Sequence, residues 1–122
     1  MVLFPPEWIK EHPDFPKTIP KTTEIVPPTT LIQQANVVEK YLATNWTGIC
    51  SQLPNISKRT LIITGTHDNN VPPANSLVIA GKIPGAWLVQ IKDAGHAIPS
   101  QYPDKINRVL QTFLSVTITS PS

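Results

Sequence analysis

The sequence of 122 residues contains a single cysteine, Cys50. This excludes an intramolecular disulfide and a zinc site built from cysteines, and it is compatible with a reducing compartment. No apolar run approaches the roughly 18–20 residues that cross a bilayer, and the first ten residues lack the basic start and the apolar stretch of a signal peptide. We therefore expect a cytoplasmic protein without a membrane span.

The sequence also lacks a large excess of charge of one sign. The formal net charge is +2, charged residues make up 15% of the chain and hydrophobic residues 40%. This balance excludes a disordered polyelectrolyte and gives no sign of a nucleic-acid partner. The length fits one domain, since single cores commonly contain about 100–150 residues.

Proline is abundant instead. Of the 14 prolines, seven lie within the first 28 residues, so this part of the chain is expected to be irregular. Pro5 to Lys10 can begin a short helix, because proline at the first turn loses no hydrogen bond, and Pro13 and Pro16 are expected to end it. The stretch Thr18–Thr30 is predicted to be an extended or turning connector.

From Thr30 to about Trp46 there is no proline or glycine, and apolar residues recur at steps of three and four, which predicts an amphipathic helix. Thr29 or Thr30 is its expected N-cap, and Gly48 lies where it should end. The helix is followed by a polar connector, residues 51–59.

The remaining sequence alternates between strand and helix signals. Periodicity and turn residues predict strands at Thr60–Thr64 and Ala86–Ile91, helices at Asn75–Lys82 and Asp104–Leu114, and a loop at Lys92–Pro103. The first strand, with its run Leu61-Ile62-Ile63, is expected to be buried on both faces. This order is typical of a parallel βαβα unit.

Two loops leave the carboxyl ends of these strands, where open α/β sheets bind their ligands. The first carries Asp68 and the second carries His96. They are 28 residues apart in sequence, but the crossover should return His96 to the side of Asp68. A carboxylate there would orient the imidazole and stabilise its protonated form, as a general base acting on a hydroxyl nucleophile requires.

The sequence here resembles the α/β-hydrolase fold serine hydrolases, over roughly residues 31 to 115. The resemblance rests on Leu61-Ile62-Ile63-Thr64-Gly65-Thr66-His67-Asp68-Asn69-Asn70-Val71-Pro72-Pro73, Ile83-Pro84-Gly85-Ala86 and Gly95-His96. In that family a strand leads to a glycine, an acid three residues later and a Val-Pro pair, and the next strand leads to Gly-His. The resemblance implies that Asp68 is the acid and His96 the base of a Ser-Asp-His triad in an esterase-like or lipase-like enzyme.

The resemblance also implies an α/β fold class and a domain division. Residues 1–30 would be a mostly helical or irregular cap remnant with its proline-rich connector, 31–117 the carboxyl-terminal part of the hydrolase core, and 118–122 a tail. The family's nucleophile precedes the acid within a Gly-x-Ser-x-Gly turn, and no such segment occurs in this sequence. The sequence therefore predicts a carboxyl-terminal fragment without a nucleophile, and no turnover by the chain alone.

The expected partners follow from this prediction. They are a small-molecule substrate in the complete enzyme and either the missing amino-terminal part or a second copy of the chain, since the Leu61 strand would have an unpaired edge. No cofactor or metal is expected.

Two other functions stay open. One is a non-enzymatic remnant or binding module with the same partial fold, and the other is a metal-assisted hydrolase using His67, Asp68 and His96. Asp68 alone could also be a turn residue. Asp93 is interpreted as a solvated loop acid, His12 as a surface residue without a partner, and the tryptophans as packing residues.

Overall fold

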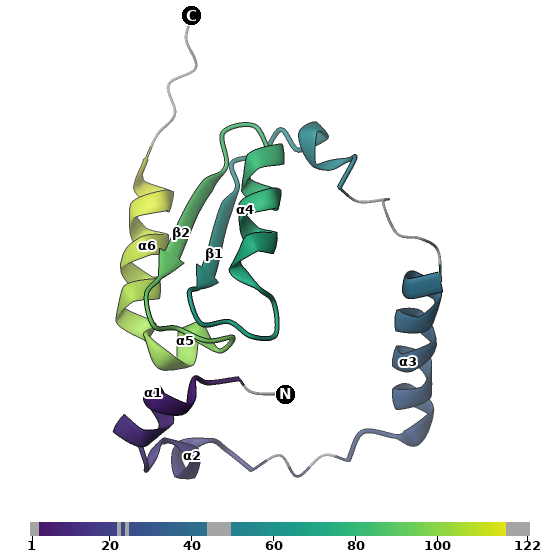
Figure 1. Ribbon diagram of the computed structural model, residues 1–122, viewed down its shortest axis with the longest axis vertical. Helices are drawn as coiled ribbons and strands as arrows, with labels where there is room; N and C mark the ends of the chain where they lie inside the picture. Colours follow the sequence, from purple (N-terminus) through teal and green to yellow (C-terminus); the bar gives the residue numbers. More distant parts are fainter. Residues whose placement is uncertain (1–2, 22, 24, 44–49, 117–122) are drawn as a thin grey trace, which may run out of the picture.

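The computed structural model of the protein describes residues 3–21, 23, 25–43 and 50–116. At its centre two strands, β1 (Leu61–Gly65) and β2 (Trp87–Ile91), form a parallel sheet (Figure 1). Their register pairs Leu61 with Trp87 and Gly65 with Ile91. Helix α4 (Pro73–Lys82) connects them, and helices α5 (Ile98–Gln101) and α6 (Pro103–Ser115) follow. The predicted parallel βαβα unit is confirmed.

The core of this unit lies where β2 meets the final helices. Ile91, Ala94 and Ile98 are buried together, and partly buried apolar residues surround them, namely Ile63, Val89, Tyr102, Ile106 and Val109. The prediction that β1 is buried on both faces is wrong for its first three residues, which are only half-buried. Among the described residues β1 pairs with β2 alone, so its other edge has no neighbouring strand.

The loop predicted at Lys92–Pro103 is shorter than expected because it contains α5. Pro99 occupies the first turn of this short helix, where proline loses no hydrogen bond. The last helix begins at Pro103 for the same reason, one residue before the predicted start.

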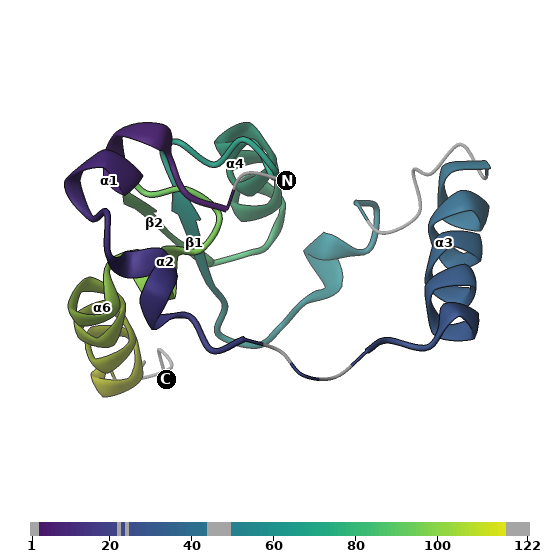
Figure 2. The ribbon, with the colours of Figure 1, turned by 90° about the horizontal axis from the view of Figure 1, so that it is seen from below.

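The amino-terminal segment forms two short helices, α1 (Pro6–Glu11) and α2 (Phe15–Thr18), beside the carboxyl ends of the strands (Figure 2). Pro16 was expected to end a helix, but it lies in the first turn of α2. The Trp8 ring is 5% exposed and packs against Phe4 and Phe15, which confirms a packing role for this tryptophan. The Ala97 N–H donates to the Leu3 carbonyl oxygen at 3.1 Å, so this segment contacts the loop after β2 directly.

Helix α3 (Pro28–Ala43) lies apart from the sheet (Figures 1 and 2). The helix begins at Pro28, so Thr29 and Thr30 lie inside it and the prediction that one of them is the N-cap is wrong. The Thr30 N–H donates to the Pro27 carbonyl oxygen at 2.9 Å. Its apolar side chains are more than half exposed, namely Leu31, Ile32, Val37 and Val38. The division of the chain into domains stays a prediction.

The connector at residues 51–59 contains a 3₁₀ turn, η1 (Leu53–Asn55), with Leu53 buried. Trp46, Gly48 and the predicted tail at 118–122 lie outside the described residues. No helix in the described part of the chain is long and apolar enough to cross a membrane.

Candidate active site at the carboxyl ends of the strands

Asp68 and His96 meet at the edge of the sheet where β1 and β2 end. The His96 Nδ1 atom lies 3.0 Å from Asp68 Oδ2, so the predicted contact between these residues is present. The Asp68 side chain is 8% exposed and that of His96 is 34% exposed. The pair therefore has a buried acid and an imidazole that a substrate can reach.

The loop after β1 fixes the Asp68 carboxylate. Its Oδ1 atom accepts hydrogen bonds from the N–H groups of Asn70 at 2.9 Å and Val71 at 2.8 Å. One carboxylate oxygen of Asp68 thus stabilises the turn, and the other faces His96. The two interpretations of Asp68 are compatible, because the turn orients the carboxylate toward the imidazole.

This geometry also determines the tautomer of the neutral His96 imidazole. A carboxylate only accepts hydrogen bonds, so the Nδ1 atom of a neutral His96 ring carries the proton. The Nε2 atom is then the basic nitrogen. This is the tautomer that a general base uses to remove a proton from a hydroxyl group.

Burial raises the pKa of the Asp68 carboxyl, but hydrogen bonds from the Val71 N–H, the His96 ring and the Asn70 N–H together lower the pKa below its ordinary value of 3.8. The folded state therefore favours the carboxylate. The resulting stabilisation is complete above the pKa that the Asp68 carboxyl has in the unfolded chain. It is lost as the pH falls through the pKa of this carboxyl in the folded protein.

We predict that the unfolding free energies of wild type and Asp68→Asn converge in acid. The measurement is denaturant unfolding of both proteins between about pH 6 and pH 2. The wild type should lose its advantage only near and below pH 3.8, the ordinary pKa of the carboxyl. An advantage that is constant or grows toward acid would contradict the described contacts of Asp68.

Gln101 is a site residue that the sequence interpretation missed. Its Oε1 atom accepts a hydrogen bond at 2.7 Å from the buried N–H of Gly95, the residue before His96. The Gln101 side chain is buried, and its Nε2 atom has no partner in the described part of the chain. The sequence shows Gln101 only as a polar residue five positions after His96. Its burial becomes evident once α5 is known.

Replacing Gln101 with methionine should destabilise the protein by about 1–3 kcal/mol, because the Gly95 N–H is left buried without an acceptor. Methionine has nearly the same helix propensity, so the lost acceptor dominates. Gln90→Met is the matched control at an exposed position of β2, with an expected change within about 0.5 kcal/mol. Equal effects in denaturant unfolding would show that the Gln101 hydrogen bond does not support the loop.

The other candidate residues lie outside this pair. His67 Nδ1 is 3.8 Å from Asp93 Oδ1, and both side chains are more than half exposed. Asp93 has a φ of 62°, and its N–H donates to Thr66 Oγ1 at 2.9 Å, so this acid has a defined place in the loop. In the described part of the chain no three His, Cys, Asp or Glu side chains form a group that could hold a metal ion. The metal-assisted alternative gains no support there.

His12 is exposed, as predicted, but the expectation that it lacks a partner is wrong. Its Nδ1 atom lies 2.9 Å from the Trp8 carbonyl oxygen, and its ring stacks on the Trp8 indole at a centroid distance of 4.2 Å. The sequence did not reveal this contact because it depends on the i to i+4 spacing within and just beyond α1.

Comparison with known structures identifies the fold of the chain. MGS-M2, an α/β hydrolase from a Medee basin deep-sea metagenome library, superposes on 98% of the chain and 43% of its own length, with a TM-score of 0.68 and 19% identity. An esterase from Thermogutta terrifontis superposes with a TM-score of 0.52 and 32% identity, over 53% of this chain and 24% of its own. The chain carries part of an α/β-hydrolase fold.

Comparison of sequences alone shows less about the chain than comparison of structures does. No protein-family model matches the chain. The polyketide synthase ThaQ of Burkholderia thailandensis is 32% identical over 68 residues, which are 56% of this chain and 3% of the synthase. The chain thus spans about a quarter of the length of the esterase and a small part of the synthase. In this part of an α/β-hydrolase fold, Asp68 lies in the loop after β1 and His96 in the loop after β2.

Proposed function

We propose that this α/β-hydrolase fold contributes Asp68 and His96, as triad acid and base, to the hydrolysis of an ester-type bond. The observation that carries the proposal is the 3.0 Å contact between His96 Nδ1 and a buried carboxylate that two backbone N–H groups also orient. The esterase among the structural neighbours supports the reaction class.

The proposed chemistry assigns one task to each side chain. The Nε2 atom of His96 takes the proton of a serine hydroxyl while the serine oxygen bonds to the carbonyl carbon of the substrate. The Asp68 carboxylate stabilises the imidazolium that results, which then protonates the leaving alcohol. A water molecule releases the acyl group by the same two proton transfers.

The serine nucleophile would come from a polypeptide segment that the 122 residues do not include, since they contain no Gly-x-Ser-x-Gly turn. We propose that this segment pairs with the free edge of β1. That edge has no strand beside it among the described residues, and Leu77 and Val78 of α4 are half exposed. A paired strand would satisfy the backbone groups of β1 and cover apolar surface.

A chimeric enzyme tests the proposal. Residues 53–116 replace the matching segment of the Thermogutta terrifontis esterase, so that any triad in the chimera contains Asp68 and His96. We expect hydrolysis of an activated ester by the chimera and its loss on His96→Ala. A folded chimera that hydrolyses no ester, or that His96→Ala leaves unchanged, would contradict the proposal and favour a binding module.

A further inference from the structure

A short piece of the amino-terminal segment, residues 3–5, lies directly against the loop that carries His96. We call this piece the strap. The carbonyl oxygen of its first residue accepts a hydrogen bond of 3.1 Å from the Ala97 N–H. Its last residue, Pro5, is buried, and a Cβ atom at Gly95 would lie only 2.7 Å from the Pro5 Cδ atom. The strap therefore contacts the residue on each side of His96.

Gly95 makes this close approach possible. A Cβ atom at Gly95 would also lie 2.9 Å from the Leu3 carbonyl oxygen and 3.3 Å from the Pro5 nitrogen, so a side chain there would push the strap away. Among the described glycines only Gly85 has a positive φ. The contact with the strap, rather than the backbone conformation, thus accounts for a glycine before His96.

The backbone on both sides of His96 is held by other parts of the chain. The Gly95 N–H donates to Gln101 Oε1 of α5 at 2.7 Å, and the Ala97 N–H donates to the strap. The His96 side chain is 34% exposed, so the position of its ring depends on the contact with Asp68 and on this backbone. A catalytic group has to be held within about 0.5 Å of its productive position. Loss of the strap would therefore loosen the contact between His96 and Asp68.

An aromatic cluster attaches the strap to α1 and α2. The ring centroid of Phe4, the middle residue of the strap, lies 5.3 Å from that of Trp8 and 5.1 Å from that of Phe15. The centroids of Trp8 and Phe15 are 4.8 Å apart, and the His12 ring stacks on Trp8. Such ring pairs stabilise a fixed arrangement. The cluster thus holds the strap in place from the side that faces away from the loop's hydrogen bonds.

The core of the βαβα unit does not include these residues. Its buried cluster consists of Ile91, Ala94 and Ile98, and the described residues packed against that cluster come from β1, β2 and the segment after residue 101. We therefore expect the unit to stay folded when the strap leaves the loop. The docked and the released strap are then two states of one folded chain.

We propose that the strap positions His96 for its contact with Asp68, and that release of the amino-terminal segment from the loop disengages the two residues. As an account of how the triad base is regulated, this inference rests on the proposed function. The coupling itself involves only contacts within the chain. A bound molecule that displaces the amino-terminal segment would lower the rate of hydrolysis without contacting either triad residue.

The test is the tautomer of the His96 ring, measured by NMR of the ring nitrogens in the 122-residue chain in alkaline solution, where imidazoles are neutral. A ring bonded to the Asp68 carboxylate carries its proton on Nδ1, and a released ring loses the acceptor that fixes this tautomer. Trp8→Ala and Phe4→Ala each remove a ring from the aromatic cluster and should release the strap. We expect the ratio of the Nδ1–H to the Nε2–H form to fall at least about fivefold in each variant.

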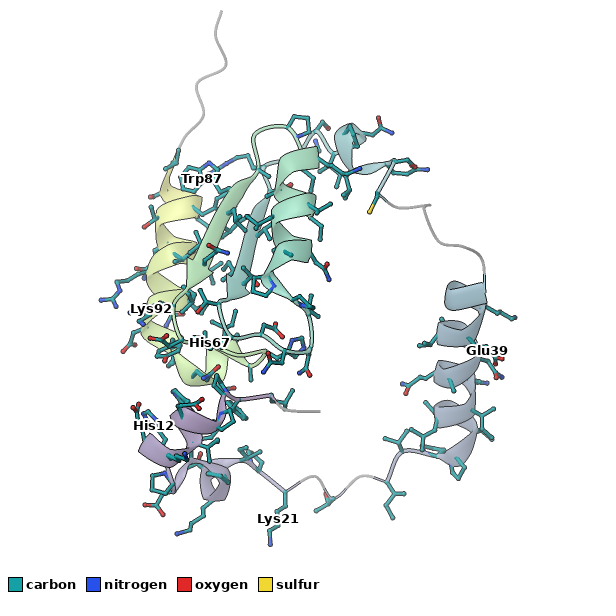
Figure 3. The ribbon with its side chains drawn as sticks, in the orientation of Figure 1. His12, Lys21, Glu39, His67, Trp87 and Lys92 are labelled. Carbon is teal, nitrogen blue, oxygen red and sulfur yellow. The ribbon has the colours of Figure 1, made fainter. Side chains whose placement is uncertain are left out.

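Trp87→Ala is the matched control. It removes the same indole from the first residue of β2, at the far end of the sheet from His12 and His67 (Figure 3). The Trp87 ring packs against Phe113 instead of the aromatic cluster. This variant should change the tautomer ratio by less than about twofold, because distant sites act independently. Trp8→Phe keeps an aromatic ring in the cluster and should restore most of the wild-type ratio.

The methyl signals of Ile91 and Val109 report whether the core is folded. An unchanged tautomer ratio in a cluster variant that keeps these signals, or an equal change in Trp87→Ala, would overturn the inference. Loss of the core signals in both cluster variants would also overturn it, since the aromatic cluster would then support the whole unit rather than His96.

This measurement needs no hydrolysis, so its failure is distinguishable from that of the proposed function. A lowered tautomer ratio beside an inactive chimera would contradict the proposed function alone. An unchanged ratio beside an active chimera would contradict the role of the strap alone.

Discussion

Asp68→Asn in the chimeric esterase is expected to lower kcat by about 10⁴-fold, because an amide neither stabilises the imidazolium nor keeps the proton on Nδ1 of His96. The carboxamide is nearly the same size as the carboxylate, and its oxygen can still accept from the Asn70 and Val71 N–H groups. The folded structure should therefore remain near pH 7 while the rate falls. The measurement is steady-state hydrolysis of an activated ester, with circular dichroism to confirm folding.

Asp104→Asn is the control for this substitution. Asp104 lies in the first turn of α6, exposed to solvent, and makes no contact with His96 among the described interactions. It should change kcat by less than about twofold while costing at most about 1 kcal/mol of helix stability. If the two asparagine variants had similar kcat values, Asp68 would not be the triad acid.

Gly65→Ala is expected to cost about 2–4 kcal/mol of unfolding free energy, the largest stability effect among these variants. A Cβ atom at Gly65 would lie 2.3 Å from the Ala94 carbonyl oxygen and 2.6 Å from that of Gly95. Both are backbone atoms of the loop that carries His96, so the clash cannot be relieved by turning a side chain. The loop must move away from β1, and the contact between Asp68 and His96 should loosen with it.

Gly81→Ala provides a matched comparison. Gly81 lies within α4, and nothing lies within 4 Å of the position that its Cβ would take. Alanine there should stabilise the protein by about 0.5–1 kcal/mol, because glycine is a poor helix former. Denaturant unfolding of both variants checks the pair, and a neutral Gly65→Ala would mean that the loop does not sit against β1 as described.

The sequence was sufficient to predict the contact between Asp68 and His96, because each residue has a local sequence signal and parallel strands bring such positions together in a general way. Asp68 and His96 each follow a short apolar strand, and parallel strands end at one edge of a sheet. Their contact therefore required only that the crossover be parallel, which the helix signal at Asn75–Lys82 indicated. The observed bounds of the two strands, α4 and α6 differ from the predicted ones by at most two residues.

The features that the sequence did not predict depend on how the chain folds back on itself. Gln101 and the Gly95 N–H come together only because α5 turns the chain back over the loop. A cavity of about 220 Å³ between α1 and the loops after β1 and β2 combines Glu7 and Glu11 with residues more than 50 positions later, such as His67. The apolar spacing in α3 predicted a helix correctly, but periodicity does not reveal what covers a helix, and this one lies apart from the sheet.

The central claim is that the chain supplies the acid and the base of a serine hydrolase but no nucleophile. Its most direct test is ester turnover by the 122-residue chain and by the chimera, each beside its His96→Ala variant, with a phosphonate probe to label reactive serines. We predict turnover and labelling in the chimera alone, with the turnover lost on His96→Ala. Turnover by the 122-residue chain above its own His96→Ala control, with covalent labelling of one of its serines, would contradict the claim.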